Sequence, residues 1–126
     1  MFDKKYFTGI ESRLQHLSKF KGGSIWLSPI YQSPMVDFGY DISDFQAIDP
    51  IFGTIEHLQS LIISAHNVGV RVVLDFIPNH SSDQHEWFLK SLKREDPYTD
   101  YYVWVDPKGY DEEGNPIPPS NWVINY

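Results

Sequence analysis

The feature that most constrains the fold is an amphipathic helical segment followed at once by a nearly continuous apolar run. Apolar residues recur at helical spacing between Thr54, a typical N-cap residue, and Gly69, a typical residue at a helix end. Residues 70–77 are then rich in β-branched side chains, which predicts a strand covered on both faces, as in parallel sheets. A short apolar run at residues 24–30 predicts an earlier strand. Together these segments predict a βαβ unit.

Two further helices are expected from their capping patterns. Residues 8–20 carry apolar side chains at helical spacing, and Thr8 with Glu11 fits a capping box. Asp83 with Glu86 fits a second capping box, which predicts that a third helix starts at Asp83. The expected buried side of this last helix consists of Trp87, Phe88 and Leu92.

The remaining segments predict loops rather than further sheet. Residues 31–50, with their prolines, glycine and aspartates, indicate a long surface loop, and residues 95–126 indicate an irregular or small β-rich excursion. Two strands do not close a sheet, and a (β/α)₈ barrel needs about 250 residues. We therefore expect this chain of 126 residues to be part of a larger domain.

Composition narrows the function classes. The chain has 10 basic and 17 acidic residues, a net charge of −7 and 41% hydrophobic residues, so it fits a folded acidic domain. The absence of a basic stripe argues against nucleic acid as a partner. The absence of cysteine excludes disulfides and thiolate metal sites within these residues. No apolar run reaches the roughly 18 residues that cross a bilayer, so no transmembrane segment is expected in this chain.

The densest group of reactive side chains follows the strand expected at residues 70–77. Asp75, Asn79 and His80 place a carboxylate, an amide and an imidazole at its carboxyl end, where parallel α/β folds bind ligands. A purely structural interpretation stays open, because a buried Asp often caps a loop and a single His is often only hydrogen-bonded.

A second group combines acidic and aromatic side chains. Asp37 and Tyr40 flank Gly39 in a stretch that suits sugar recognition, because an aromatic ring stacks on the apolar face of a pyranose while carboxylates accept hydrogen bonds from its hydroxyls. The alternative is a solvated acidic turn. Since both groups follow successive strands, a barrel would bring them to the same rim.

Four motifs follow one another along the chain: IWLSPI at residues 25–30, SPMVDFGYDISDF at 33–45, FGT at 52–54 and DFIPNHSSD at 75–83. In this order and approximate spacing they resemble the alpha-amylase family of glycoside hydrolases (family 13), most closely its animal and insect maltases, or alpha-glucosidases. The resemblance runs from Phe7 to near the end of the chain.

The resemblance implies a (β/α)₈ barrel with a small domain, domain B, inserted after the third strand. Residues 25–30 and 70–77 would be the second and third barrel strands. Residues 1–94 would form the N-terminal part of the catalytic barrel, and residues 95–126 the start of domain B.

The resemblance also assigns roles to the rim residues. It implies that His80 binds a hydroxyl of the terminal sugar, and that Asp37 and Tyr40 contact and stack on the same sugar. It implies that Asp75 supports the cleft, and that Asn79 is a ligand of a structural calcium ion, which prefers oxygen donors.

Catalysis is expected to depend on residues outside this sequence. In the family, the nucleophilic Asp lies on barrel strand four and the acid/base Glu on strand five, so we expect no catalytic residue in this chain and no activity of the chain alone. The resemblance implies a retaining alpha-glucosidase that acts on maltose, sucrose or short oligosaccharides. It further implies a secreted or extracellular membrane-associated protein.

Two other functions stay open. The ectodomain of an amino-acid transporter heavy chain keeps the barrel without being an enzyme, but Asp37 and Tyr40 retain the sugar-contacting residue types here. A free-standing carbohydrate-binding or regulatory module is the other alternative, and the open edges of the expected sheet argue against it.

Overall fold

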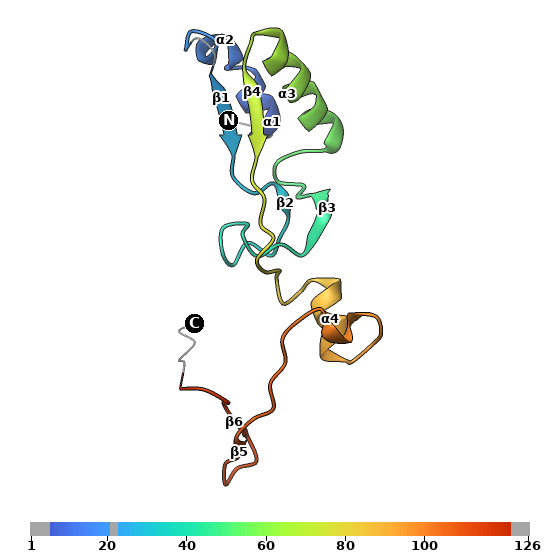
Figure 1. The fold of residues 1–126 in the computed structure, drawn as a ribbon. Helices are drawn as coiled ribbons and strands as arrows, with labels where there is room; N and C mark the ends of the chain where they lie inside the picture. The colour runs from blue at the N-terminus through green and yellow to red at the C-terminus, as the bar shows by residue number, and fades with distance from the viewer. Residues whose placement is uncertain (1–5, 21–22, 122–126) are drawn as a thin grey trace.

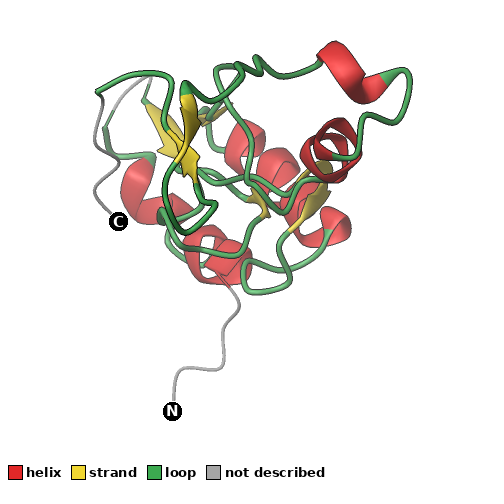
Figure 2. Ribbon diagram, turned by 90° about the horizontal axis from the view of Figure 1, so that it is seen from below, coloured by secondary structure: helices red, strands yellow, loops and turns green. Residues whose placement is uncertain are grey.

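A computed structural model describes residues 6–20 and 23–121. In chain order, the elements are α1 (Tyr6–Glu11), α2 (Leu14–Leu17), β1 (Ser24–Leu27), β2 (Tyr31–Gln32), β3 (Asp44–Ile48), α3 (Ile55–Asn67), β4 (Arg71–Leu74), α4 (Glu86–Leu92), the 3₁₀ helix η1 (Tyr98–Asp100), β5 (Gly109–Tyr110) and β6 (Pro116–Ile117). The chain runs from a helix-and-strand unit at one end, through the β2–β3 pair and α4, to the β5–β6 hairpin (Figure 1). Figure 2 shows that the strands are short and joined by long loops.

The predicted βαβ unit is confirmed. β1 and β4 pair in parallel, with Ile25 opposite Val72 and Leu27 opposite Leu74. The crossover contains α3, whose residues 55–67 follow the predicted N-cap Thr54. Gly69 follows the helix with φ +74°, a left-handed conformation that glycine adopts without strain.

A capping box between Thr54 and His57 stabilises the start of α3, although the usual sequence pattern for such a box is absent. The Thr54 hydroxyl accepts from the His57 amide at 3.4 Å, and the Thr54 amide donates to His57 Nδ1 at 3.2 Å. An imidazole thus replaces the usual Glu or Gln at the third helical position.

The hydrophobic core lies between the helices and one face of the β1–β4 pair. Its buried members are Phe7, Leu14, Leu27, Ile30, Leu58, Leu61, Ala65 and Val70. A polar clamp at its edge joins the first helix to α3, because Glu11 Oε1 accepts hydrogen bonds from Ser60 at 2.9 Å and Ser64 at 2.6 Å.

The single helix expected over residues 8–20 is wrong, and so is its capping box. The helix begins at Tyr6, breaks after Glu11 and resumes at Leu14. The Ser12 hydroxyl donates to the Gly9 carbonyl at 2.7 Å, a local bond that competes with the helical pattern. The Glu11 carboxylate binds serines of α3 instead of closing a cap.

The surface loop expected over residues 31–50 is also wrong in part. β2 and β3 pair antiparallel within it, with Tyr31 opposite Ile48 and Gln32 opposite Asp44. β2 is only 2 residues long, and the alternation of polar and apolar residues in β3 is too short to identify its partner from the sequence.

The strand expected over residues 70–77 is shorter and more exposed than predicted. β4 ends at Leu74, before Asp75. The face of the β1–β4 pair opposite the core is open: Trp26 is 58% exposed and its register partner Val73 is 47% exposed. No described element covers this face.

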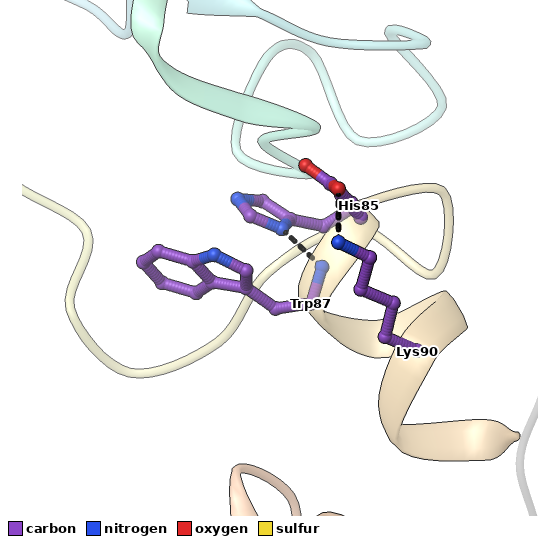
Figure 3. A network of polar contacts seen from close by, with 4 residues as sticks. His85, Trp87 and Lys90 are labelled. Carbon is purple, nitrogen blue, oxygen red and sulfur yellow. Dashed lines mark hydrogen bonds and ion pairs between the residues drawn. The ribbon is translucent and has the colours of Figure 1, made fainter. Parts of the chain in front are cut away.

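The N-cap of α4 lies two residues later than expected, and the helix begins at Glu86. His85, not Asp83, is the N-cap of α4, and its Nδ1 accepts from the Trp87 amide at 3.0 Å (Figure 3). Burial lowers the pKa of His85, although Asp44 and Glu86 oppose this, so Nδ1 stays an unprotonated acceptor at neutral pH. An ion pair between Lys90 and Glu86 follows on the exposed side.

The buried side predicted for α4 is wrong in part. Phe88 is half-buried against Tyr102 and Trp104, whereas Trp87 is 41% and Leu92 55% exposed. Ser91, which was not predicted, is fully buried. The Ser91 hydroxyl donates to the Thr99 carbonyl at 3.2 Å and accepts from Trp104 Nε1 at 2.9 Å. A helix of 7 residues thus buries a polar residue, because the following segment folds back on it.

The segment after residue 94 agrees with the expected irregular, slightly β-rich excursion as far as it is described. It contains η1 and the short β5–β6 hairpin, in which Gly109 lies opposite Ile117. Residues 122–126 of that expectation lie outside the described residues. The domain boundary at residue 94 stays a prediction.

Among the described helices, none is both long and apolar enough to cross a membrane.

We predict that the open face of the β1–β4 pair makes the isolated chain self-associate. Replacing Trp26→Ser together with Val73→Thr should lower the mean particle mass seen by sedimentation, because it removes exposed apolar surface that parallel sheets normally cover. Ile63→Thr, an equally exposed apolar site on α3, should leave the mass unchanged. A wild-type chain that sediments as a monomer would contradict this prediction.

Candidate functional site

The predicted site residues lie where the chain leaves the two parallel strands. Asp75 follows β4 directly, and Tyr31, in the strand that follows β1, reaches across to it. The Tyr31 hydroxyl donates to the Asp75 carbonyl oxygen at 2.9 Å, and the Phe76 amide donates to Asp75 Oδ1 at 3.0 Å. The first of these bonds fixes the Asp75 backbone and the second fixes its carboxylate.

Tyr40 joins the loop between β2 and β3 to Asp75. A hydrogen bond with the Asp75 carboxylate raises the pKa of the Tyr40 phenol, as do lost hydration and the negative charges of Asp75 and Asp37. Tyr40 therefore stays a neutral phenol at neutral pH, with its proton available to Asp75. The structure thus brings together Asp37, Tyr40 and Asp75, which are separated by up to 38 positions in the sequence, 75 − 37.

His80, in the loop after β4, contacts the backbone of Tyr40. Its Nε2 lies 3.1 Å from the Tyr40 carbonyl oxygen, which only accepts, so Nε2 carries the proton. Its Nδ1 lies 3.3 Å from Asn79 Nδ2, and in the neutral ring it accepts from that amide. Both nitrogens of His80 are engaged, so a ligand hydroxyl has to displace one of these partners to bind the ring.

The loop that carries Asp37 and Tyr40 is held by Asp41. The Asp41 carboxylate accepts from the Ser33 hydroxyl at 2.8 Å and from the amides of Val36 and Asp37 at 2.9 and 3.1 Å. Burial raises the pKa of Asp41, but these hydrogen bonds outweigh it, so the pKa lies below its ordinary value. The sequence around Asp41 suits a solvated acidic turn and does not predict this role.

A pocket of about 620 Å³ lies beside this group. It is lined by Phe45, Phe76, Ile77, Pro78, Asn79, His80, Ser81, Asp83, Trp87, Phe88, Tyr101 and Tyr102. Of the predicted site residues it includes Asn79 and His80, whereas Asp37, Tyr40 and Asp75 are not among its lining residues.

The aromatic residues that line the pocket were not predicted from the sequence to be functional. Phe45 stacks on Trp87 with ring centres 6.1 Å apart, and the Tyr102 hydroxyl lies 2.5 Å from the Ser81 hydroxyl. These residues come from β3, α4 and the segment after α4. The only signal in the sequence is the high aromatic content, 16% of the chain, which does not say which rings meet.

Asn79 alone does not make a calcium site. Calcium takes six to eight oxygen ligands, and no group of three or more His, Asp or Glu side chains among the described residues is placed to hold a metal ion. Because Asn79 Nδ2 faces His80, its amide oxygen is left as the donor that the prediction requires. The described residues therefore do not by themselves fit a complete calcium site, and the role of Asn79 stays a prediction.

Comparison with known proteins places this geometry in a family. Residues 6–126 match the model of the alpha-amylase catalytic domain. Maltase A2 of Drosophila melanogaster is 57% identical over 115 residues, which cover 91% of this chain and 20% of that protein. A human amino acid transporter heavy chain is 42% identical, covering 94% of this chain and 17% of that protein.

Solved structures agree with the sequence relatives. The alpha-glucosyl transfer enzyme XgtA superposes with a TM-score of 0.81 at 42% identity, covering 93% of this chain and 21% of that one. This chain spans about a fifth of the length of the relatives it matches. A match of this extent, in which β1 and β4 are neighbouring parallel strands of a partial (β/α)₈ barrel, shows that the chain belongs to the alpha-amylase family and forms part of its catalytic domain.

Proposed function

We propose that this chain supplies the binding site for the terminal glucose of an alpha-glucosidase that hydrolyses maltose, sucrose or short oligosaccharides. The observation that carries the proposal is the convergence of Tyr40, Asp75 and His80 in one hydrogen-bonded group at the ends of two parallel strands. In barrels of this kind, that end of the strands is where substrates bind. The 57% identity to an insect maltase supports the same activity.

Tyr40 and Asp37 would bind the glucose in two different ways, Tyr40 by stacking on the ring and Asp37 by hydrogen bonding to its hydroxyls. The Tyr40 phenol lies beside the Asp75 carboxylate, which raises its pKa, and its ring can stack on the apolar face of the sugar. Asp37 is exposed, so its carboxylate is accessible to accept hydrogen bonds from sugar hydroxyls. Asp75 would act by positioning Tyr40 rather than by touching the reacting bond.

His80 would bind a sugar hydroxyl through Nδ1. Its bond from Asn79 is the longer of its two contacts, 3.3 Å against 3.1 Å for the Tyr40 carbonyl. A hydroxyl that replaces Asn79 at Nδ1 would donate to the ring while Nε2 stays on the loop. The histidine would then join the sugar to the loop that carries Tyr40.

Cleavage is assigned to other residues. Retaining hydrolysis uses two carboxyl groups about 5–5.5 Å apart on either side of the scissile bond. Asp37 and Asp75 match binding and supporting positions of the family, so we propose that the isolated chain is inactive. We also propose, by the same family membership, that residues 95–126 begin domain B and that the whole protein is secreted or attached to the outside of a membrane.

A non-enzymatic role, as in the transporter heavy chains, has weaker support. The human relative of that class is 42% identical, against 57% for the insect maltase. The intact set of Asp37, Tyr40 and His80 also favours sugar binding.

The test uses a grafted maltase, in which this chain replaces the matching segment of Drosophila Maltase A2. We expect the grafted maltase to hydrolyse maltose, whereas the isolated chain does not. Asp37→Ala and His80→Ala should each lower kcat/KM about 10- to 100-fold, because each removes a hydrogen bond to the substrate that involves a charged or fixed group.

Matched controls separate this effect from general damage. Asp106→Ala and His66→Ala change exposed residues of the same types away from the site and should leave kcat/KM unchanged. Tyr40→Phe, which keeps the ring, should lose less activity than Tyr40→Ala. A grafted maltase that folds but does not cleave maltose would favour the transporter-like role instead.

A further prediction concerns the Asp41 clamp and its dependence on pH. Asp41→Asn should speed hydrogen exchange of the 33–43 peptide about tenfold at neutral pH, since a carboxylate with three donors loses its charge. Because the folded pKa is lowered, the stabilisation is present above the ordinary pKa of 3.8 and is lost as pH falls through the folded value. The difference between the two proteins should therefore shrink as pH falls below 3.8 and vanish only below the lowered, folded pKa of Asp41.

Hydrogen-exchange mass spectrometry of the grafted maltase, with rates corrected for pH, makes this measurement. Asp106→Asn serves as the control and should match the wild type throughout. An exchange rate in Asp41→Asn equal to the wild type at pH 7 would show that the carboxylate does not hold the loop.

A further inference from the structure

The turn between Asp37 and Tyr40 contains a residue that its backbone does not favour. The Tyr40 amide donates to the Asp37 carbonyl at 2.9 Å, which closes a four-residue turn. The two central residues both have positive φ, +52° for Phe38 and +94° for Gly39, as in a type I′ turn. Such turns favour Asn, Asp or Gly at the first central position, because a bulky side chain is strained there.

Packing does not explain the phenylalanine. Its side chain is 88% exposed, so the ring gains almost nothing from burial in the described part of the chain. The turn itself is firmly held, because Asp41 binds the amide of Asp37 and His80 binds the carbonyl of Tyr40. A fixed loop therefore presents an aromatic ring to solvent at the cost of backbone strain.

Strained positions of this kind gather at functional sites, where the residue type serves binding rather than folding. Phe38 lies between Asp37 and Tyr40, the two residues proposed to hold the terminal glucose. An exposed apolar ring on a firmly held turn, next to that sugar, offers a stacking surface to whatever is attached to the sugar.

We propose that Phe38 is a specificity-determining residue whose ring stacks on the second sugar of the substrate, the one bonded to the terminal glucose. The inference rests on the proposed function and extends it from the terminal glucose to its neighbour. Phe38 would contribute to binding of substrates with at least two rings and would be indifferent to those with one.

The experiment compares two substrates in the grafted maltase: maltose, with two rings, and α-glucosyl fluoride, with one. Phe38→Asn removes the ring and supplies a residue that the turn favours, so the protein should stay folded. It should raise KM for maltose roughly three- to tenfold, the effect of losing one ring contact, and leave KM for α-glucosyl fluoride unchanged. Phe38→Trp, which keeps an aromatic ring, should retain the wild-type KM for maltose.

Two further variants test whether the effect on KM comes from the Phe38 ring itself. Phe38→Gly also removes the ring and adopts positive φ freely, so it should reproduce Phe38→Asn. Phe20→Asn removes another exposed aromatic ring, outside the loop, and should change neither KM.

The outcomes separate this inference from the function on which it rests. If the grafted maltase cleaves both substrates and loss of the Phe38 ring changes KM for both equally, or for neither, the stacking role is overturned while the glucose site stands. If the grafted maltase with Phe38 intact folds but cleaves neither substrate, the proposed function fails and the role of Phe38 falls with it.

Discussion

The parallel pairing of β1 with β4 is the constraint on which the rest of the molecule depends. It is fixed from one side by α3, whose Leu61 and Ala65 are fully buried against the strands. Because the pairing is parallel and in register, the chain leaves both strands at the same end, with Leu27 opposite Leu74. The Tyr31 hydroxyl can then reach the Asp75 carbonyl, and the two loops of the site are joined. An antiparallel pairing of the same strands would place these loops at opposite ends.

How well each element could be predicted depends on how local its causes are. α3 was predictable because Thr54, the apolar stripe and Gly69 act within the helix itself. The role of Glu11 was not, because its carboxylate binds Ser60 and Ser64, about 50 positions away in the sequence, instead of closing a capping box with Thr8. The prediction of Asp83 as the N-cap of α4 was wrong for a similar reason. His85 fits as an N-cap because its ring is buried against Phe45 of β3, which keeps Nδ1 unprotonated.

The same distinction applies to the site. Asp37, Tyr40, Asp75 and His80 were recognisable as a set from motifs, but their connections were not. That the Tyr40 phenol is tied to Asp75, and that both nitrogens of His80 are engaged, follows only from bringing two distant loops together. The clamp by Asp41 was equally hidden, because an acidic residue in a loop is usually solvated, and only geometry shows three donors converging on this one.

Two kinds of exposed apolar surface in this chain have different causes. Trp26 and Val73 lie on the sheet face away from the helices, which in a (β/α)₈ barrel points to the interior and is filled by the other strands. Their exposure reflects family architecture and says nothing about ligands. Phe38 lies on no sheet face, in a turn whose backbone disfavours a bulky side chain. The two surfaces therefore differ in the backbone beneath them: β-branched and aromatic residues suit an extended strand, whereas a bulky aromatic residue at positive φ is strained, and that strain is the reason to look for a binding role at Phe38.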